Sequence, residues 1–160
     1  MFLYRVALEL YASDLSGEGA KRYGGRWNPK GMAAVYTAES ASQALLEYLP
    51  HFQETCAPPD VVLVTINVPD TLPIKEITEE NLPANWDARP PIPATAMLGE
   101  KWLRERSFVG LRVPSVMLPY GKAWNLILNP QHPKFSEICV TEIISLSVDP
   151  RLGEKLRMKV

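Results

Sequence analysis

The chain has 160 residues, of which 46% are hydrophobic and 22% are charged, and its formal net charge is -1. A chain of this length buries a substantial core as one domain, and its composition is typical of a globular protein. A near-neutral charge argues against a protein that coats nucleic acid, which needs a strongly basic face. Because Cys56 and Cys139 are far apart, we expect two buried thiols in a reducing cytoplasm rather than a disulfide framework or a zinc site.

The N-terminus has no cationic leader followed by a long apolar run, so it does not resemble a signal peptide. No apolar run approaches the roughly 20 residues that a membrane-spanning helix needs. We therefore expect a cytoplasmic protein without membrane association, folded as a single domain over residues 1–160.

The first predicted element is a strand at residues 2–8, whose two faces are both largely apolar. Arg5 is unusual on such a face, and it either reaches solvent along its apolar stem or belongs to a site. Residues 13–31 predict a long loop, and loops of this length are often functional. Four cations crowd this loop: Lys21, Arg22, Arg26 and Lys30. They form either a solvated surface or an anion-binding site.

A second strand is predicted at residues 33–38, where Ala34 and Ala38 flank Tyr36 on one face. Small neighbours leave room for a ligand against the tyrosine ring, although a tyrosine of the core would fit the same pattern. Together with the loop before it, this strand places a cation and an aromatic ring close in sequence.

The next element is a helix that starts at Ser40, because Gln43 three residues later completes a capping-box signature. An apolar stripe follows at helical spacing, and Pro50 is expected to tighten or end the helix. Glu47 lies at the border of this stripe. Its carboxylate is therefore placed where it can line a cleft.

The second half of the chain is rich in strands, and the proline-dense segment 82–93 is expected to be irregular. Further elements are predicted as strands at 61–68, 113–118, 124–128 and 138–148, a helix at 95–107 and a charged tail with weak helical tendency at 151–160. Strands without regular alternation with helices predict an α+β fold with a mixed, largely antiparallel sheet. The strand-rich half would close a cleft opened by the first half.

Several common catalytic motifs are missing. Gly17 and Gly19 lack the third glycine, the preceding strand and the following helix of a dinucleotide fingerprint, and no P-loop is present. The histidines His51 and His132 lie in no catalytic or metal-binding motif, and His132 is expected to brace a turn. We therefore expect no metal and no bound cofactor.

Two polar residues lie among the predicted strands of the second half. Ser115 follows a proline, which is typical of a residue that satisfies a turn, and no Gly-x-Ser-x-Gly elbow marks it as a nucleophile. At the floor of a cleft it would instead hydrogen-bond a ligand. Asn125 on the next strand either offers its amide to the same ligand or pairs with a neighbouring loop.

Taken as a set and in this order, these residues resemble the RES-domain family, which is named for a characteristic arginine, glutamate and serine. The likeness extends from Tyr4 to about Phe135. It is carried by Arg5, Gly24-Gly25-Arg26-Trp27-Asn28, Tyr36, Glu47, Pro114-Ser115 and Asn129-Pro130-Gln131-His132-Pro133.

The resemblance implies a fold similar to ADP-ribosyltransferases, with flanking helices around a central cleft, and a toxin of a type II toxin–antitoxin pair. Such toxins deplete NAD+, which is their substrate, by hydrolysis or phosphorolysis of the nicotinamide–ribose bond or by passing ADP-ribose to a protein. The implied partner is an Xre-like helix-turn-helix antitoxin that covers the active site. A homodimer within the complex is also implied, and direct DNA binding by this chain is not.

The resemblance also implies a role for each residue. Glu47 would bind the ribose hydroxyl and stabilise positive charge at the anomeric carbon, and Tyr36 would stack on the nicotinamide ring. Arg26 and Arg5 would bind the pyrophosphate. Ser115, and less directly Asn125, would hydrogen-bond nicotinamide or ribose.

A rival from another class is a non-catalytic or RNA-acting module in which the loop from Lys21 to Lys30 meets nucleic-acid phosphates. The sequence favours it less, because Trp27 beside that loop does not by itself make a stacking platform. No histidine pair is present for RNA cleavage either.

Overall fold

The computed structural model describes residues 1–51, 60–118 and 121–147. Within them, one seven-stranded sheet has the order β4-β5-β6-β2-β1-β3-β7. The strands are β1 (Phe2–Leu8), β2 (Val35–Ala38), β3 (Val61–Asn67), β4 (Ile74–Glu76), β5 (Gly110–Pro114), β6 (Trp124–Leu128) and β7 (Cys139–Ser145). Only the β4–β5 pair is parallel among these neighbours, so the predicted α+β fold with a mixed, largely antiparallel sheet is confirmed.

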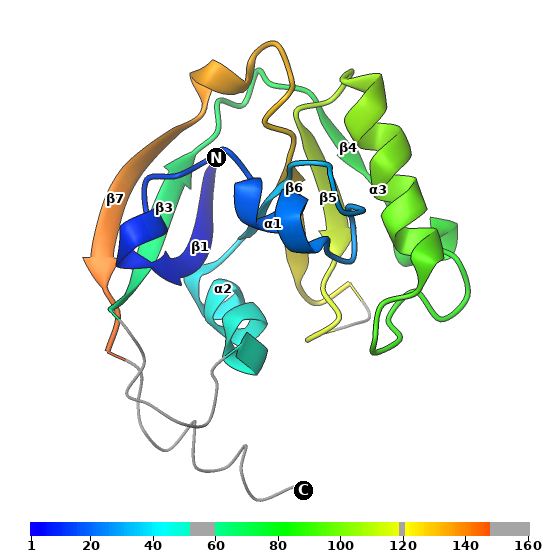
Figure 1. Ribbon diagram of the computed structural model, residues 1–160, viewed down its shortest axis with the longest axis horizontal. Helices are drawn as coiled ribbons and strands as arrows, with labels where there is room; N and C mark the ends of the chain where they lie inside the picture. The colour runs from blue at the N-terminus through cyan, green and yellow to red at the C-terminus, as the bar shows by residue number, and fades with distance from the viewer. Residues whose placement is uncertain (52–59, 119–120, 148–160) are drawn as a thin grey trace, which may run out of the picture.

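Three α-helices flank the sheet in the described part of the chain: α1 (Glu18–Tyr23), α2 (Ala41–Tyr48) and α3 (Pro93–Glu105). Figure 1 shows α3 beside β4 and β5 at one end of the sheet, whereas α1 lies in front of β6 and α2 lies near the lower end of β1. No described helix combines the length and the apolar character needed to cross a bilayer.

The sheet separates the buried side chains into clusters. One cluster joins β1, β3 and β6 and includes Leu3, Val64 and Leu126. A second cluster packs α3 against β5 and β6, with Trp102 only 1% exposed. A third, smaller cluster packs α2 against β1 and β2 around Ala44. Helix α2 is thus fixed against the middle of the sheet, which places Glu47 over the central strands.

Two of the predicted helix boundaries are confirmed in detail. Ser40 is the N-cap of α2, and its Oγ accepts a hydrogen bond of 3.2 Å from the backbone N–H of Gln43. The α-helix ends at Tyr48 and continues as a 3-10 turn over Leu49–His51, at the proline that was expected to tighten or end it. The irregular segment before α3 is also present, although α3 begins two residues earlier than predicted, with Pro93 in its first turn.

The prediction of a loop without structure over residues 13–31 is wrong at α1. This helix has no buried residue and so no apolar stripe that the sequence would reveal. Its start depends on backbone geometry, because Gly17 adopts φ 73° and a Cβ there would lie 2.7 Å from the backbone nitrogen of Ala34. Only glycine fits this contact without strain.

The strand limits around β5 were also predicted wrongly. The expected strand at 113–118 lies at 110–114, and the parallel partner β4 was not predicted. Gly110 begins β5, and glycine is an unfavourable strand residue, which hides the true start. The three residues of β4 are too few to show an alternating pattern.

Cys139 is exposed, so the expectation of a buried thiol is wrong there, because it lies on β7 at the edge of the sheet. Cys56 and the tail at 151–160 lie outside the described residues.

Candidate active site

The centre of the candidate site is the carboxylate of Glu47 on α2. One of its oxygens, Oε1, accepts three hydrogen bonds from three parts of the chain. The donors are Gln43 Nε2 at 3.0 Å, Ser115 Oγ at 2.7 Å and Asn125 Nδ2 at 2.6 Å. No hydrogen bond to Oε2 from a described residue accompanies them. Three donors on one oxygen suit a carboxylate that carries its negative charge.

The sheet explains how residues so distant in sequence meet at Glu47. Strands β5 and β6 are antiparallel with Val113 opposite Asn125. The pairing continues past the end of β5, where the N–H of Ser115 donates to the carbonyl of Ala123 at 2.9 Å. Ser115 and Asn125 are therefore neighbours on adjacent strands, and α2 packs its carboxylate above them.

Ser115 is fully buried, with an exposed fraction of 0%. Its hydroxyl hydrogen is directed at Glu47, while its oxygen accepts from Gln43 Nε2 at 2.5 Å and from the backbone N–H of Met117 at 3.0 Å. A serine hydroxyl has one donor and two acceptor lone pairs. All three are used within the protein, so this serine supports Glu47 and has no free group for a ligand.

Tyr36 on β2 has its hydroxyl fixed in a similar way. The phenol donates to Asn28 Oδ1 at 2.7 Å and accepts from the backbone N–H of Trp27 at 2.9 Å. Burial raises the pKa of this phenol far above its usual value. Its hydroxyl is therefore occupied by contacts within the protein and stays protonated near neutral pH. A Cβ on Gly25 would lie 2.9 Å from Tyr36 Cζ, which explains the need for glycine beside the ring.

Arg26 lies in the loop before β2 and contacts a distant segment of backbone. Its Nη1 donates to the carbonyl of Trp86, and its Nη2 donates to the carbonyl of Ala88 at 3.0 Å. Burial lowers the pKa of this guanidinium, the charge of Arg89 lowers it further, and Glu47 and Tyr36 oppose both effects. Glu47 and Tyr36 are therefore near enough to affect the charge of Arg26. Through its two hydrogen bonds, Arg26 also holds the 82–92 segment in place.

Arg5 faces the same side of the sheet as the cleft. Its Nη2 donates to the carbonyls of Tyr11, Ala12 and Asp14 at 2.9, 3.0 and 2.9 Å, while its Nε is buried without a hydrogen-bond partner. Burial lowers the pKa of this guanidinium, against the opposing charge of Asp14. Arg5 thus fixes the chain that leads into α1, and its Nη1 makes no hydrogen bond to a described residue.

A cleft of about 590 Å³ lies in front of the Glu47 carboxylate. Its walls come from β1, β2, α1, α2 and β6, and Arg5, Tyr36, Glu47 and Asn125 line it. The volume lies in the range of small-molecule sites. Arg26 and Ser115 stand behind this lining, so the structure brings four of the six predicted site residues to the cleft surface and two to its support.

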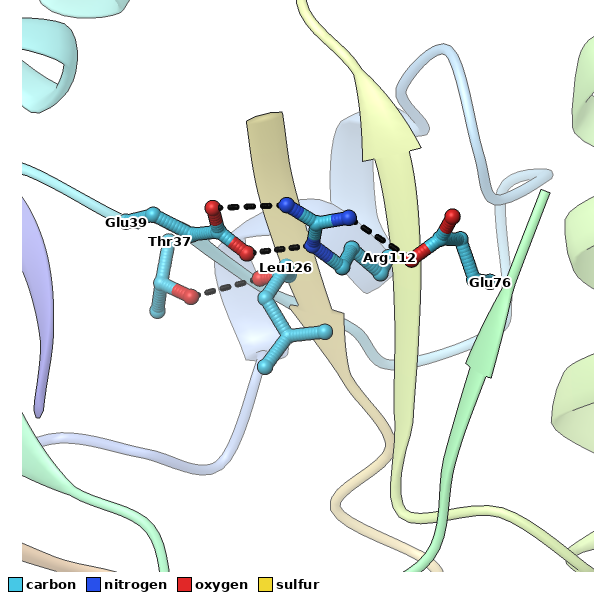
Figure 2. A network of polar contacts seen from close by, with 5 residues as sticks. All are labelled: Thr37, Glu39, Glu76, Arg112 and Leu126. Carbon is cyan, nitrogen blue, oxygen red and sulfur yellow. Dashed lines mark hydrogen bonds and ion pairs between the residues drawn. The ribbon is translucent and has the colours of Figure 1, made fainter. Parts of the chain in front are cut away.

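A second network braces the strands on which the site is built. Figure 2 shows the guanidinium of Arg112 between Glu39, which directly follows β2, and Glu76 on β4. Its Nε and Nη2 bind the two oxygens of Glu39 at 2.5 and 3.0 Å, and its Nη1 binds Glu76 Oε2 at 2.6 Å. The guanidinium also lies 4.0 Å from the centroid of the Trp124 ring. These contacts connect β2, β4, β5 and β6.

Sequence reasoning missed Gln43 as a site residue and treated it only as a capping residue. A signal was present, because residues four apart on a helix share one face. Gln43 precedes Glu47 by that distance. The expected role of His132 is confirmed, since its Nδ1 accepts from the backbone N–H of Lys134 at 3.1 Å and so braces the turn.

Comparison with known proteins assigns the chain to a family. The RES domain matches residues 2–149, and the chain belongs to the RES domain family. It is 42% identical over 156 residues to Toxin Res of Yersinia enterocolitica, an alignment that covers 95% of this chain and 99% of that protein. It is 40% identical over 146 residues to the Prs ADP-ribosylating toxin of a Sphingobium species, covering 90% of this chain and 89% of that protein.

A solved structure has the same fold. One chain of the crystal structure of the Mycobacterium tuberculosis MbcT–MbcA toxin–antitoxin complex matches with a TM-score of 0.75 and 26% identity, covering 98% of this chain and 88% of that one. MbcT of that organism is named an NAD(+) phosphorylase, and 34 residues of this chain are 56% identical to it, which is 21% of this chain and 18% of MbcT. The family and the fold expected from the sequence are both confirmed.

Proposed function

We propose that this protein is the toxin of a toxin–antitoxin pair and that it breaks the nicotinamide–ribose bond of NAD+. The observation that carries the proposal is the carboxylate of Glu47, held by three donors on one oxygen at the wall of a cleft that Tyr36 also lines. The names of the relatives, which include an NAD(+) phosphorylase and an ADP-ribosylating toxin, support the same substrate.

The proposed reaction needs no strong nucleophile. Nicotinamide in NAD+ is a cationic leaving group, so the bond between its ring nitrogen and the anomeric carbon breaks with the electron pair passing to nicotinamide. Positive charge then develops on the ribose, and the carboxylate of Glu47 stabilises it while accepting a hydrogen bond from a ribose hydroxyl. Water or phosphate adds to the anomeric carbon and releases a proton.

The other side chains bind and orient NAD+ in this proposal. The Tyr36 ring packs against nicotinamide and holds the bond in a reactive geometry. Arg5 offers its Nη1 to the pyrophosphate, and Asn125 faces the ligand beside Glu47. Arg26 contributes its positive charge and the position of the 82–92 segment.

The direct test is to incubate the purified protein with NAD+ and to measure free nicotinamide by chromatography. We expect release, with ADP-ribose as the second product in phosphate-free buffer if water is the acceptor. A product that forms only with added phosphate, and that carries the phosphate on the anomeric carbon, identifies phosphorolysis. Intact NAD+ after incubation with folded protein would rule out the proposed reaction.

A second candidate acceptor is a cellular protein, because the Sphingobium relative of this chain is named an ADP-ribosylating toxin. The same site serves this reaction, with a protein side chain in place of water or phosphate. NAD+ labelled in its adenosine half distinguishes the two outcomes. Label recovered on a protein of the host lysate supports transfer, and label recovered only in small molecules supports degradation.

The partner in this proposal is an Xre-like helix-turn-helix antitoxin that covers the cleft. The matching solved structure is a toxin–antitoxin complex. Beside the cleft, Leu10, Tyr11 and Tyr23 are exposed and offer apolar surface. Adding the protein encoded by the neighbouring gene should suppress nicotinamide release, and light scattering of the toxin alone and of the mixture tests the expected homodimer.

A further inference from the structure

Three polar side chains donate to Glu47, namely those of Gln43, Ser115 and Asn125. Gln43 is buried almost as completely as Ser115, with an exposed fraction of 3%. It does not line the cleft, whereas Glu47 and Asn125 do. Its Nε2 donates both to Glu47 Oε1 at 3.0 Å and to Ser115 Oγ at 2.5 Å. Gln43 therefore contacts both of the side chains that form the core of the site but is screened from any ligand.

The orientation of the Gln43 amide is fixed by charge. The opposite orientation would place its carbonyl oxygen against the negatively charged Oε1 of Glu47. In the observed orientation Gln43 Oε1 is buried without a hydrogen-bond partner, and the same is true of Asn125 Oδ1. A buried acceptor without a partner is unfavourable. Both amides thus leave an acceptor unsatisfied in order to direct N–H groups at one carboxylate oxygen.

Helix geometry makes this arrangement rigid. Gln43 and Glu47 lie four residues apart, so their side chains are adjacent on one face of α2. Ser115 joins both side chains to the end of β5, and Asn125 joins Glu47 to β6. The carboxylate has little freedom to rotate, because rotation would break contacts to three elements at once.

We propose that Gln43 is a positioning residue that holds Oε1 of Glu47 toward the protein, so that Oε2 alone faces the ligand. This inference rests on the proposed action on NAD+ and names the geometry of its key carboxylate. The side chain of Gln43 acts through Glu47 and does not touch the ligand. Its loss should therefore lower kcat for nicotinamide release and leave KM for NAD+ nearly unchanged.

The test compares Gln43→Glu, Gln43→Leu and the matched control Gln131→Glu, which makes the same change at an exposed turn position. Loss of a hydrogen bond to a charged group should lower kcat of Gln43→Leu by roughly 10- to 100-fold. In Gln43→Glu, a deprotonated carboxylate would repel Glu47, whereas a protonated one would donate to it. We therefore expect kcat of Gln43→Glu to rise as the pH falls. The pH profiles of the wild type and of Gln131→Glu should not show this rise.

A wild-type kcat and pH profile in Gln43→Glu would overturn the inference, as would a rise in KM with kcat unchanged. Circular dichroism and thermal unfolding check that each variant folds. If Gln43→Glu does not fold, Gln43→Leu alone decides through the split between kcat and KM.

A readout without turnover keeps this inference separate from the proposed function. In the nitrogen-15 NMR spectrum of the wild type, the side-chain amide signals of Gln43 should exchange slowly with solvent and should shift in Ser115→Ala but not in Gln131→Glu. Rapid exchange, or signals unmoved by Ser115→Ala, would contradict the positioning role. Wild-type protein that leaves NAD+ intact would refute the proposed reaction, and the amide signals would still decide how Glu47 is held.

Discussion

The hydroxyl of Ser115 donates a hydrogen bond of 2.7 Å to Glu47 Oε1 across 68 positions of sequence. The two residues act as one unit, because Ser115 has no other hydrogen to give and no free lone pair. A serine in this position resembles neither a nucleophile nor a ligand contact. Its contribution is the orientation of the carboxylate, and that view leads to measurable consequences.

Replacing Ser115 with alanine should impair both activity and stability. The change leaves the N–H of Met117 and one contact of Gln43 without an acceptor in the interior, which should lower the free energy of unfolding by about 1–3 kcal/mol. Nicotinamide release should fall as well. The exposed Ser136→Ala is the matched control and should change neither quantity. Denaturant unfolding and product chromatography measure the two effects.

The coupling of Ser115 to Glu47 can be measured in a double-mutant cycle. If the serine acts only through the carboxylate, Ser115→Ala should cost little further activity once Glu47→Gln is present. Strictly multiplicative losses in the double variant would mean that Ser115 has an independent role. The cycle uses kcat for nicotinamide release from NAD+ for all four proteins.

Replacing Glu47 with glutamine should lower nicotinamide release by roughly 10²-fold or more, because the neutral amide cannot stabilise charge that develops on the ribose. The affinity for the product ADP-ribose should change far less than the rate, because its anomeric carbon carries no positive charge. Calorimetry can measure this affinity. Glu105→Gln, at an exposed position on α3, is the control for the same chemical change. Full activity in Glu47→Gln would exclude the proposed mechanism even if the wild type consumes NAD+.

The raised pKa of the Tyr36 phenol predicts that the stability of the protein depends on pH. Burial raises the pKa of its phenol above the ordinary value of 10.0. The unfolded chain ionises this tyrosine at lower pH than the folded chain does, so the stabilising contribution is complete below pH 10.0 and is lost as the pH rises toward the folded value. Thermal unfolding between about pH 8 and 11 should show a steeper alkaline loss in the wild type than in Tyr36→Phe. Equal slopes would show that the phenol ionises normally.

Tyr36→Phe also separates the hydroxyl from the ring. The hydroxyl joins Asn28 and the backbone of Trp27, so its loss should destabilise the protein by about 1–3 kcal/mol at neutral pH. The ring remains in Tyr36→Phe, and nicotinamide release by the folded variant should stay close to that of the wild type. Tyr36→Ala removes the ring and should raise KM for NAD+.

The sequence predicted those parts of the site that depend on local patterns. The N-cap residue Ser40 correctly indicated the start of α2 and hence the face on which Glu47 lies, although the Gln43 side chain does not complete the capping box and bonds Glu47 and Ser115 instead. Ala34, Tyr36 and Ala38 all line the cleft, as the small residues beside Tyr36 indicated, and the ring also packs against the core cluster of Trp27 and Ile127, as the alternative of a core tyrosine expected. These features depend on residues within one helical turn or one strand, where periodicity is informative.

The parts that could not be predicted depend on contacts between distant elements. Whether Ser115 faces a ligand or another side chain follows from the β5–β6 register and from α2 packing above it. The register was hidden because the limits of β5 are set by pairing with β4 and β6 and not by the pattern of its five residues. Helix α1 depends on the close approach of Gly17 to Ala34, which local sequence does not encode.

Arg26 gives the last prediction, because its two bonds to carbonyls demand a planar group with separated donors. Lysine offers a single nitrogen and cannot reach the carbonyls of both Trp86 and Ala88 in the same geometry. In Arg26→Lys we expect the 82–92 segment to exchange its amide hydrogens faster and to be cut more readily by protease, and we expect nicotinamide release to fall.

The matched control for Arg26→Lys is Arg104→Lys on α3, where an exposed ion pair with Glu100 tolerates a lysine. If Arg26 only binds ligand phosphates, its replacement should raise KM for NAD+ and leave hydrogen exchange of the free protein unchanged. If it supports the segment, exchange should accelerate without any ligand present. Hydrogen-exchange mass spectrometry of the free protein therefore separates a guanidinium that binds the substrate from one that builds the wall behind it.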